Sequence, residues 1–211
     1  MVYRNKAELI RALVMKDDVV LDVGFWGQGV GHESPQWPHK LLKERAKEVY
    51  GLDLEFDEPY ASDAHYLKAS AEHFDFPVKF TLIFAGDLIE HLSNPGLFLE
   101  SCKRNLAPGG RLIITTPNTF NLFNLVEKLT KREPTVNKDH TCYFNSKTLE
   151  ALFAKCGFAV QGFDYVYALD VKYQESMKKK FLNAVYGFLA LFTDKFMETL
   201  VVMAKARDSR P

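Results

Sequence analysis

The chain is poor in cysteine, carries no excess charge of either sign, and has no hydrophobic run long enough to cross a membrane. Its three cysteines, Cys102, Cys142 and Cys156, are odd in number and far apart, and no CxxC pair occurs. A disulfide framework and a thiolate zinc site are therefore both disfavoured. The 27 Lys and Arg residues balance the 27 Asp and Glu residues, so we expect no extensive nucleic-acid surface.

The start of the chain is charged and lacks the apolar core of a signal peptide. The longest uncharged apolar stretch near the other end, residues 181–193, falls short of the roughly 20 residues that span a bilayer. A length of 211 residues, with 47% hydrophobic and 26% charged residues, suits a single globular domain over residues 1–211. We therefore expect a reduced, soluble, cytoplasmic protein.

Short apolar runs alternate with helical spacing along the chain. Continuous apolar runs such as Val19-Val20-Leu21-Asp22-Val23 are typical of strands buried on both faces of a parallel sheet. The segments predicted as strands are residues 19–23, 49–53, 66–69, 80–85, 111–116, 158–169 and 198–206. The segments predicted as helices are residues 5–15, 40–46, 95–106 and 147–155, and a turn is predicted at residues 108–110. This alternation predicts a doubly wound α/β sheet whose ligands bind outside the carboxyl ends of the strands.

The first predicted strand is followed by four glycines within eight positions, Gly24, Gly27, Gly29 and Gly31. Glycines let the backbone turn tightly and let a ligand approach main-chain N–H groups closely. A GxGxxG fingerprint that starts at Gly27 would need glycine where His32 stands, and the Gly-Lys-Ser/Thr of a Walker A loop is absent. The glycines therefore indicate a ligand site, but a pyrophosphate ligand is disfavoured.

The second predicted strand ends at Asp53, in the sequence Tyr-Gly-Leu-Asp-Leu. An acidic residue at this place accepts hydrogen bonds from ribose hydroxyls in other nucleoside-binding α/β folds. Together with the glycine-rich turn before it, Asp53 favours a nucleoside ligand.

These segments resemble, in order and over nearly the whole chain, the class I S-adenosylmethionine-dependent methyltransferases. Asp22-x-Gly24 with Gly27 and Gly29 resembles the acidic-x-Gly-x-Gly-x-Gly loop of that family, and Asp53 resembles its ribose-binding acid. Residues 70–72 resemble the segment beside adenine, residues 84–92 the end of the fourth strand, and residues 106–112 the Leu-x-Pro-Gly-Gly-x-Leu turn. Residues 139–158 resemble the late segment of small-molecule O-methyltransferases, including the ubiquinone-pathway type.

The resemblance implies a Rossmann-like, doubly wound, seven-stranded sheet that is mostly parallel and has an antiparallel last strand. It implies S-adenosyl-L-methionine as the cofactor. It also implies a small-molecule acceptor, such as a quinone precursor, a lipid-linked group or a sugar. The cofactor-binding residues that it implies are Asp22, Gly24, Phe25, Gly27, Gly29, Asp53, Leu54, Ser70, Ala71, Glu72, Ala85, Gly86 and Asp87.

Two departures from the family pattern keep an alternative open. Phe25-Trp26 stands where the family has one residue, and Ser70 stands where it usually has aspartate. A non-catalytic protein that keeps the cofactor fold as a binding or scaffolding module is therefore the alternative from another functional class.

Two histidines are the candidate catalytic residues. His91 follows the fourth predicted strand, and His140 lies in the long connection after the fifth. The transfer itself needs no protein nucleophile, because holding the acceptor near the methyl group supplies much of the catalysis. A hydroxyl acceptor profits from a general base, and histidine titrates near neutral pH. We therefore expect His91 or His140 to remove the acceptor proton.

A metal-dependent alternative uses the same region. Asp87, Glu90 and His91 have i, i+3, i+4 spacing, which would place them on one face of a helical turn. With His140 they resemble the divalent-metal site of small-RNA 3′-terminal 2′-O-methyltransferases, and such ligands suit magnesium or manganese. The chain lacks a basic stripe with interleaved aromatic residues. We therefore predict no metal and keep a metal-dependent RNA 2′-O-methyltransferase as the alternative.

Two segments are expected to cap the acceptor pocket, residues 119–146 and residues 170–196. In the first, the apolar side chains expected to face inward are those of Phe120, Leu122, Phe123 and Leu125. In the second, residues 178–193 begin with three lysines and continue as an apolar run. That pattern is also typical of a helix that contacts a membrane surface in plane, so peripheral membrane contact is a second interpretation of this part.

Overall fold

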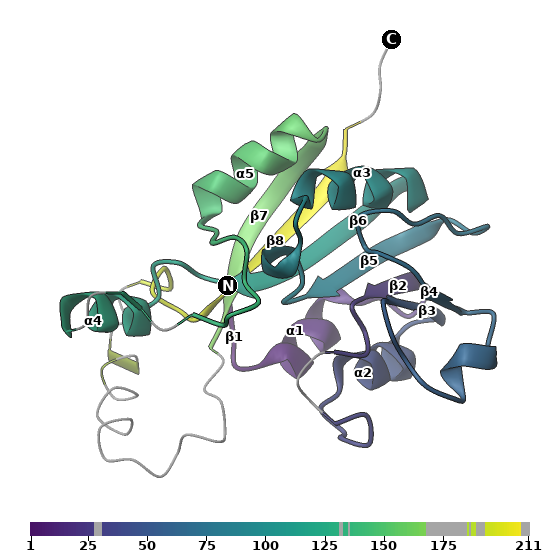
Figure 1. Ribbon diagram of the computed structural model, residues 1–211, viewed down its shortest axis with the longest axis horizontal. Coiled ribbons are helices and arrows are strands. Elements are labelled where there is room, and N and C mark those ends of the chain that lie inside the picture. The colour runs from purple at the N-terminus through teal and green to yellow at the C-terminus, as the bar shows by residue number, and fades with distance from the viewer. Residues whose placement is uncertain are drawn as a thin grey trace.

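The computed structural model describes residues 1–27, 31–130, 133–134, 136–167, 185, 187–188 and 193–207. Within this part the chain forms an eight-stranded sheet in the order β1-β7-β8-β6-β5-β2-β3-β4 (Figure 1). The strands are β1 (Val2–Tyr3), β2 (Val19–Val23), β3 (Glu48–Asp53), β4 (Tyr66–Lys68), β5 (Phe80–Gly86), β6 (Leu106–Pro117), β7 (Phe158–Val166) and β8 (Thr199–Ala206). Strand β8 is antiparallel to both of its neighbours, and the other pairs are parallel. The predicted Rossmann-like α/β sheet, mostly parallel with an antiparallel last strand, is confirmed.

The seven predicted strands are all present, and the structure adds an eighth. Strand β1 pairs with β7 in parallel, with Val2 opposite Tyr165 and Tyr3 opposite Val166. Two residues are too few to show an apolar pattern, which is why the sequence did not reveal this strand. The turn predicted at residues 108–110 lies inside β6, where Gly109 has a φ of +74° and the register with β5 shifts.

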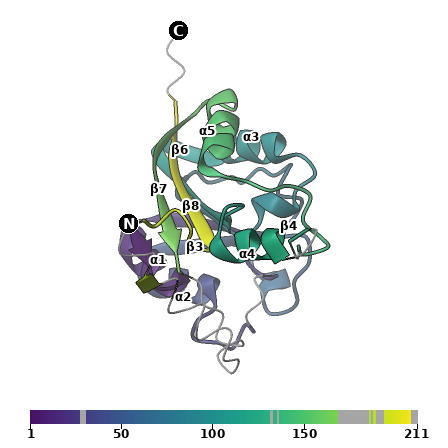
Figure 2. The ribbon, with the colours of Figure 1, turned by 90° about the vertical axis from the view of Figure 1, so that its left-hand side faces the viewer.

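Helices cover both faces of the sheet (Figures 1 and 2). They are α1 (Lys6–Leu13), α2 (Pro38–Arg45), α3 (Pro95–Asn105), α4 (Leu122–Thr130) and α5 (Ser146–Lys155), with single 3₁₀ turns η1 (Tyr60–Ser62) and η2 (Ile89–His91). Helices α1 and α2 bury leucine and isoleucine side chains on one face, and α3 and α5 bury leucine and phenylalanine side chains on the other. The four predicted helices correspond to α1, α2, α3 and α5.

Asparagine side chains fix where three of these helices begin. The side chains of Asn5, Asn94 and Asn145 accept hydrogen bonds from backbone N–H groups in the first turns of α1, α3 and α5. The hydroxyl of Thr148 in turn accepts a hydrogen bond from the backbone N–H of Asn145, which completes a capping box. These local signals explain why the predicted helix starts are close to the observed ones.

The expected capping segments are only partly described. Residues 119–146 contain α4, where the side chains of Leu122 and Phe123 pack against the core. Phe120 is 52% exposed, so the expectation that it faces inward is wrong. Most of the segment 170–196, including most of the basic and apolar part at 178–193, lies outside the described residues. Among the residues that are described, none of the helices has both the length and the hydrophobicity to cross a membrane.

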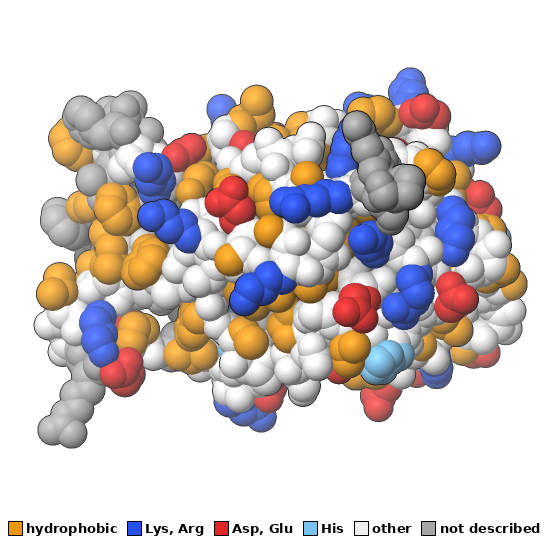
Figure 3. All heavy atoms as spheres, turned by 90° about the horizontal axis from the view of Figure 1, so that it is seen from above, with side chains coloured by type: hydrophobic (Ala, Val, Ile, Leu, Met, Phe, Trp, Pro, Cys, Tyr) orange, Lys and Arg blue, Asp and Glu red, His pale blue; other side chains and the backbone are white. Residues whose placement is uncertain are grey.

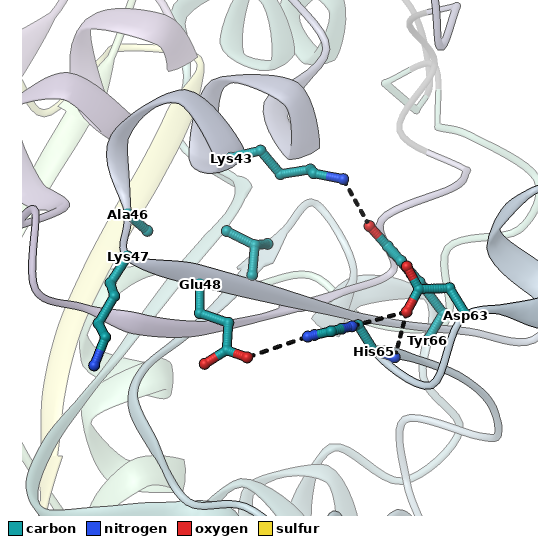
Figure 4. Close-up of a pocket in the computed structure, with 8 residues that line it drawn as sticks. Lys43, Ala46, Lys47, Glu48, Asp63, His65 and Tyr66 are labelled. Carbon is teal, nitrogen blue, oxygen red and sulfur yellow. Dashed lines mark hydrogen bonds and ion pairs between the residues drawn. The ribbon is translucent and has the colours of Figure 1, made fainter.

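A shallow pocket lies at the β3–β4 end of the sheet and is lined by charged side chains (Figure 4). Its centre is His65, whose Nδ1 lies 2.8 Å from Oδ1 of Asp63 and whose Nε2 lies 3.1 Å from Oε1 of Glu48. These hydrogen bonds, first that to Asp63 and then that to Glu48, raise the pKa of His65 above 6.5. Glu48 begins β3 and Asp53 ends it, so this pocket lies at the opposite end of the strand from Asp53.

His65→Gln is expected to remove part of the pH dependence of stability above about pH 6.5, the ordinary pKa of histidine. Because the pKa of His65 is raised in the folded state, its stabilising contribution is complete below pH 6.5 and is lost as the pH rises through the folded-state pKa. Urea unfolding measured at a series of pH values should show that the free energy of unfolding falls more steeply with rising pH in the wild type than in His65→Gln. The exposed His73 supplies the control, since His73→Gln should follow the wild type. Equal slopes for the wild type and His65→Gln would contradict this account.

Candidate functional site

The carboxyl ends of four neighbouring strands meet at one edge of the sheet. Val23, near the end of β2, lies between Leu52 of β3 and Ala85 of β5. Gly86, which ends β5, lies opposite Thr115 of β6. In open α/β sheets ligands bind outside this edge, and most of the predicted site residues follow these strand ends.

The glycine-rich loop after β2 is attached to the end of β3. Oδ2 of Asp53 accepts hydrogen bonds from the backbone N–H groups of Trp26 at 2.8 Å and of Gly27 at 3.4 Å. Gly24 has a φ of +78°, and an added Cβ there would lie 3.1 Å from the side chain of Leu88. Glycine is therefore required at position 24 by both conformation and space. Gly29, a further predicted cofactor residue, lies outside the described residues.

Two predicted cofactor residues, Asp22 and Phe25, point their side chains into the protein interior. Phe25 is fully buried among aromatic rings that include Trp37, whose Nε1 donates to the carbonyl of Phe25. Asp22 is also fully buried, with Oδ2 3.0 Å from Nδ1 of His39, and Nε2 of His39 lies 3.0 Å from the hydroxyl of Tyr66. Sequence reasoning missed His39 and Tyr66, because only the folded sheet brings them to Asp22. Any role of the Phe25 side chain toward a ligand would therefore be indirect, through the loop that it supports.

The surface beside Asp53 has the chemistry that an adenosyl group requires. Leu54 follows Asp53 directly and is 69% exposed, which gives an apolar surface next to a carboxylate that can accept ribose hydroxyls. Ser70 and Ala71 are small residues just beyond the end of β4, and Ser70 Oγ accepts a hydrogen bond from the backbone of Glu72. A single exposed leucine is common on protein surfaces, so it is the Asp53 carboxylate and its strand-end position that favour a nucleoside. These residues therefore fit the nucleoside part of S-adenosylmethionine.

The predicted residues around the end of β5 are Ala85 and Gly86, which are its last two residues, and Asp87, which follows it. Two residues that were not predicted, Lys6 and Thr115, bind the Asp87 carboxylate. Lys6 Nζ lies 2.7 Å from Oδ2 of Asp87, and Thr115 Oγ1 donates to Oδ1 at 2.7 Å. Burial alone would raise the pKa of Asp87, but the ammonium of Lys6 and the hydroxyl of Thr115 together hold it below its usual value. Asp87 is therefore a carboxylate with its partners already in place. Its φ is +52°, which turns the chain sharply at the end of β5.

The two predicted catalytic histidines lie together. His91 ends η2, His140 comes from the connection after α4, and their ring centroids are 4.6 Å apart in an edge-to-face arrangement. The backbone N–H of Thr141 donates to the carbonyl of Glu90 at 2.8 Å, and the Thr141 hydroxyl donates to the carbonyl of Leu92 at 2.7 Å. These bonds attach the segment that carries His140 to the end of β5, although the two histidines are far apart in the sequence.

Glu90 lies directly under the histidines and is 2% exposed. Its Oε2 accepts a hydrogen bond from Thr116 Oγ1 at 2.8 Å. Burial, helped by the charge of Asp87, raises the pKa of Glu90 to about 7. Burial and then the nearby His91 lower the pKa of His140.

The four residues of the metal alternative do not form one group. Glu90, His91 and His140 each offer a ligand atom within 4.8 Å of the others, but Asp87 is not in this group. Its carboxylate is instead bonded to Lys6 and Thr115.

Comparison with known proteins identifies the family. Residues 7–161, most of the chain, match the family described as methyltransferase domain. The chain belongs to the class I S-adenosylmethionine-dependent methyltransferases. The cofactor of this family is S-adenosylmethionine, which agrees with the adenosyl fit beside Asp53.

Among curated relatives, a probable S-adenosylmethionine-dependent methyltransferase of Mycolicibacterium smegmatis is 28% identical over 150 residues, 67% of this chain and 52% of the relative. A ubiquinone biosynthesis O-methyltransferase of Nitrobacter winogradskyi is 35% identical over 63 residues, 28% of this chain and 24% of the relative. The chain thus spans about half the length of the first relative and less of the second. Among solved structures, the fold is shared by the 1,6-didemethyltoxoflavin-N1-methyltransferase of Burkholderia thailandensis, which was solved with bound S-adenosylhomocysteine. The TM-score is 0.61 at 16% sequence identity, and the match covers 97% of this chain and 80% of that one.

Asp53→Asn is expected to weaken the binding of S-adenosylhomocysteine at least about tenfold, since hydrogen bonds to a charged group contribute roughly 1.5–3 kcal/mol. The amide removes one acceptor oxygen and the negative charge that the loop N–H groups of Trp26 and Gly27 use and that ribose hydroxyls would use. Isothermal titration calorimetry measures the change. Asp57 is an exposed carboxylate nearby in sequence, and Asp57→Asn should bind like the wild type. Equal affinities for the wild type and Asp53→Asn would show that this carboxylate takes no part in binding.

Proposed function

We propose that the chain transfers a methyl group from S-adenosylmethionine to a hydroxyl of a small molecule. The observation that supports this most directly is the pair of His91 and His140, with ring centroids 4.6 Å apart, at the same sheet edge as Asp53. A histidine pair beside the cofactor region can deprotonate and orient a hydroxyl acceptor.

When bound, the cofactor would supply a sulfonium-bound methyl group that an oxygen nucleophile can attack, with the neutral thioether, S-adenosylhomocysteine, as the leaving group. The part of this chain is to hold the acceptor hydroxyl, take its proton on an imidazole nitrogen and exclude water. The lowered pKa of His140 keeps its imidazole neutral, and therefore able to accept a proton, at neutral pH. His91 would then orient the hydroxyl.

The surroundings of the histidines favour an apolar or aromatic acceptor over a nucleic acid. The ring of Tyr143 lies 6.2 Å from that of His140, edge on, and Tyr143 is 39% exposed. Figure 3 shows Lys and Arg side chains interspersed with Asp and Glu on the face it presents, with hydrophobic side chains gathered at the end where Figure 1 places α4. Mixed charge of this kind is unlike the basic stripe of an RNA-binding protein. Because two partial relatives are named as ubiquinone biosynthesis O-methyltransferases, a quinone precursor is the first acceptor class to test. Lipid-linked groups and sugars are further candidates.

His91→Gln and His140→Gln are expected to lower turnover about 100-fold or more, because general base catalysis contributes at least that much. The assay is transfer of a radiolabelled methyl group to 3,4-dihydroxybenzoate, a soluble catechol, followed by a panel of phenols and sugars. The affinity for S-adenosylhomocysteine should stay within about twofold of the wild type, since His91 ends η2 and His140 lies beside it, whereas Asp53 ends β3. His73→Gln, at an exposed histidine, is the matched control.

Normal turnover in both variants would contradict the role given to the histidines. Absence of S-adenosylhomocysteine binding in the wild type would instead favour the non-catalytic binding or scaffold module. Methyl transfer to the 3′ end of a short RNA, with none to small molecules, would favour the RNA 2′-O-methyltransferase alternative.

A further inference from the structure

We propose that Glu90, His91 and His140 bind one divalent transition-metal ion, of the kind represented by Mn²⁺ or Zn²⁺, and present it to the acceptor hydroxyl. Metal binding stands on the geometry of the three side chains alone. Its use in catalysis rests on the proposed methyl transfer.

The three side chains converge on one point. Each offers a ligand atom, one carboxylate oxygen and two imidazole nitrogens, and these atoms all lie within 4.8 Å of one another. Ligand bonds to Zn²⁺ are about 2.0–2.2 Å long, so the ligands of one ion lie up to roughly 4 Å apart. Side-chain shifts of under an ångström would therefore bring all three atoms onto a single ion.

The cluster holds polar atoms that lack partners. In the described part of the chain, the buried side-chain nitrogen and oxygen atoms without a hydrogen-bond partner are Oε1 of Glu90 and Nδ1 of His140. Buried polar groups in native proteins are nearly always paired, so an orphaned one calls for an explanation such as a missing ion. Both orphaned atoms belong to residues of the same three-residue group, and an ion bound through these two atoms would satisfy both.

Hydrogen bonds from Thr116 and Thr141 orient Glu90 and leave one of its carboxylate oxygens available to a metal. Thr116 donates to Oε2 of Glu90 and leaves Oε1 free. The backbone and hydroxyl of Thr141 bond the Glu90 carbonyl. Supporting hydrogen bonds of this kind orient metal ligands. Asp87, although close in sequence, is bonded to Lys6 and Thr115 and stays outside the ligand set.

Two imidazoles and one carboxylate leave further positions on the ion open. Catalytic zinc sites combine His₂Glu ligands with an open position in this way. A divalent charge there would stabilise the deprotonated acceptor hydroxyl. The O–H electron pair would stay on the acceptor oxygen, and the proton would pass to solvent. His91 and His140 would then act as metal ligands. The cation, rather than a histidine base, would promote deprotonation of the acceptor hydroxyl.

The test is direct binding of Mn²⁺ to the full chain, by calorimetry and by electron paramagnetic resonance. Glu90→Gln keeps the hydrogen bond from Thr116 while removing the charged ligand, so the variant should fold. We expect one Mn²⁺ per wild-type chain, and binding at least about tenfold weaker in Glu90→Gln and in His140→Gln. Mn²⁺ should raise the unfolding midpoint of the wild type and leave that of Glu90→Gln unchanged.

His65→Gln is the matched control, because His65 also lies between carboxylates but its two ring nitrogens are both bonded to them. It should bind Mn²⁺ like the wild type. The proposal is overturned if neither Mn²⁺ nor Zn²⁺ binds, or if binding survives in both Glu90→Gln and His140→Gln. Methylation of 3,4-dihydroxybenzoate that persists with full activity in EDTA would also overturn the metal role, while leaving the proposed function intact. Tight Mn²⁺ binding without methylation of any acceptor would leave the metal site standing and defeat the proposed function.

Discussion

The site depends on the carboxylate of Asp53, which joins two strand ends. It accepts hydrogen bonds from the loop after β2 and from its own neighbour Leu54. Hydrogen bonds to a charged acceptor are about twice as strong as neutral ones, so this contact fixes the loop against the end of β3. The parallel register of β2, β3 and β5 then sets where the end of β5 lies. That strand end leads directly to Glu90 and His91.

A second constraint is the burial of Glu90. A buried acceptor without a partner costs about 1–3 kcal/mol, and the chain keeps one here beside two histidines. Thr116 and Thr141 position this residue, whereas the nearby Asp87 is bonded to Lys6. Asp87 and Glu90, three positions apart, are thus held in different states. Asp87 is paired with Lys6 and has a lowered pKa, whereas Glu90 is buried and has a raised pKa. Both oxygens of Asp87 are therefore bonded to other side chains, whereas Oε1 of Glu90 has no hydrogen-bond partner among the residues that the structure describes and can bind a ligand.

Local sequence signals predicted the parts of the protein that depend on near neighbours. The apolar runs predicted the seven longer strands, and the ligand site that the glycines and Asp53 indicate stays a prediction. Tertiary contacts decided the rest. The short β1 has no pattern of its own, and Lys6 reaches Asp87 only because α1 packs near the end of β5. The burial of Asp22 against His39 and the exposure of Phe120 likewise depend on which element packs where. The spacing of Asp87, Glu90 and His91 suggested one shared face, but the chain there forms a single 3₁₀ turn, with Asp87 before it, rather than a regular α-helix.

The central claim is that Asp53 and the histidine cluster serve a single reaction at one sheet edge. A crystal structure of the chain with S-adenosylhomocysteine tests it most directly. We predict that the ribose will hydrogen-bond to Asp53, the adenine will lie against Leu54, and the sulfur will face His91 and His140. Nucleoside density elsewhere, or a sulfur turned away from both histidines, would contradict the account.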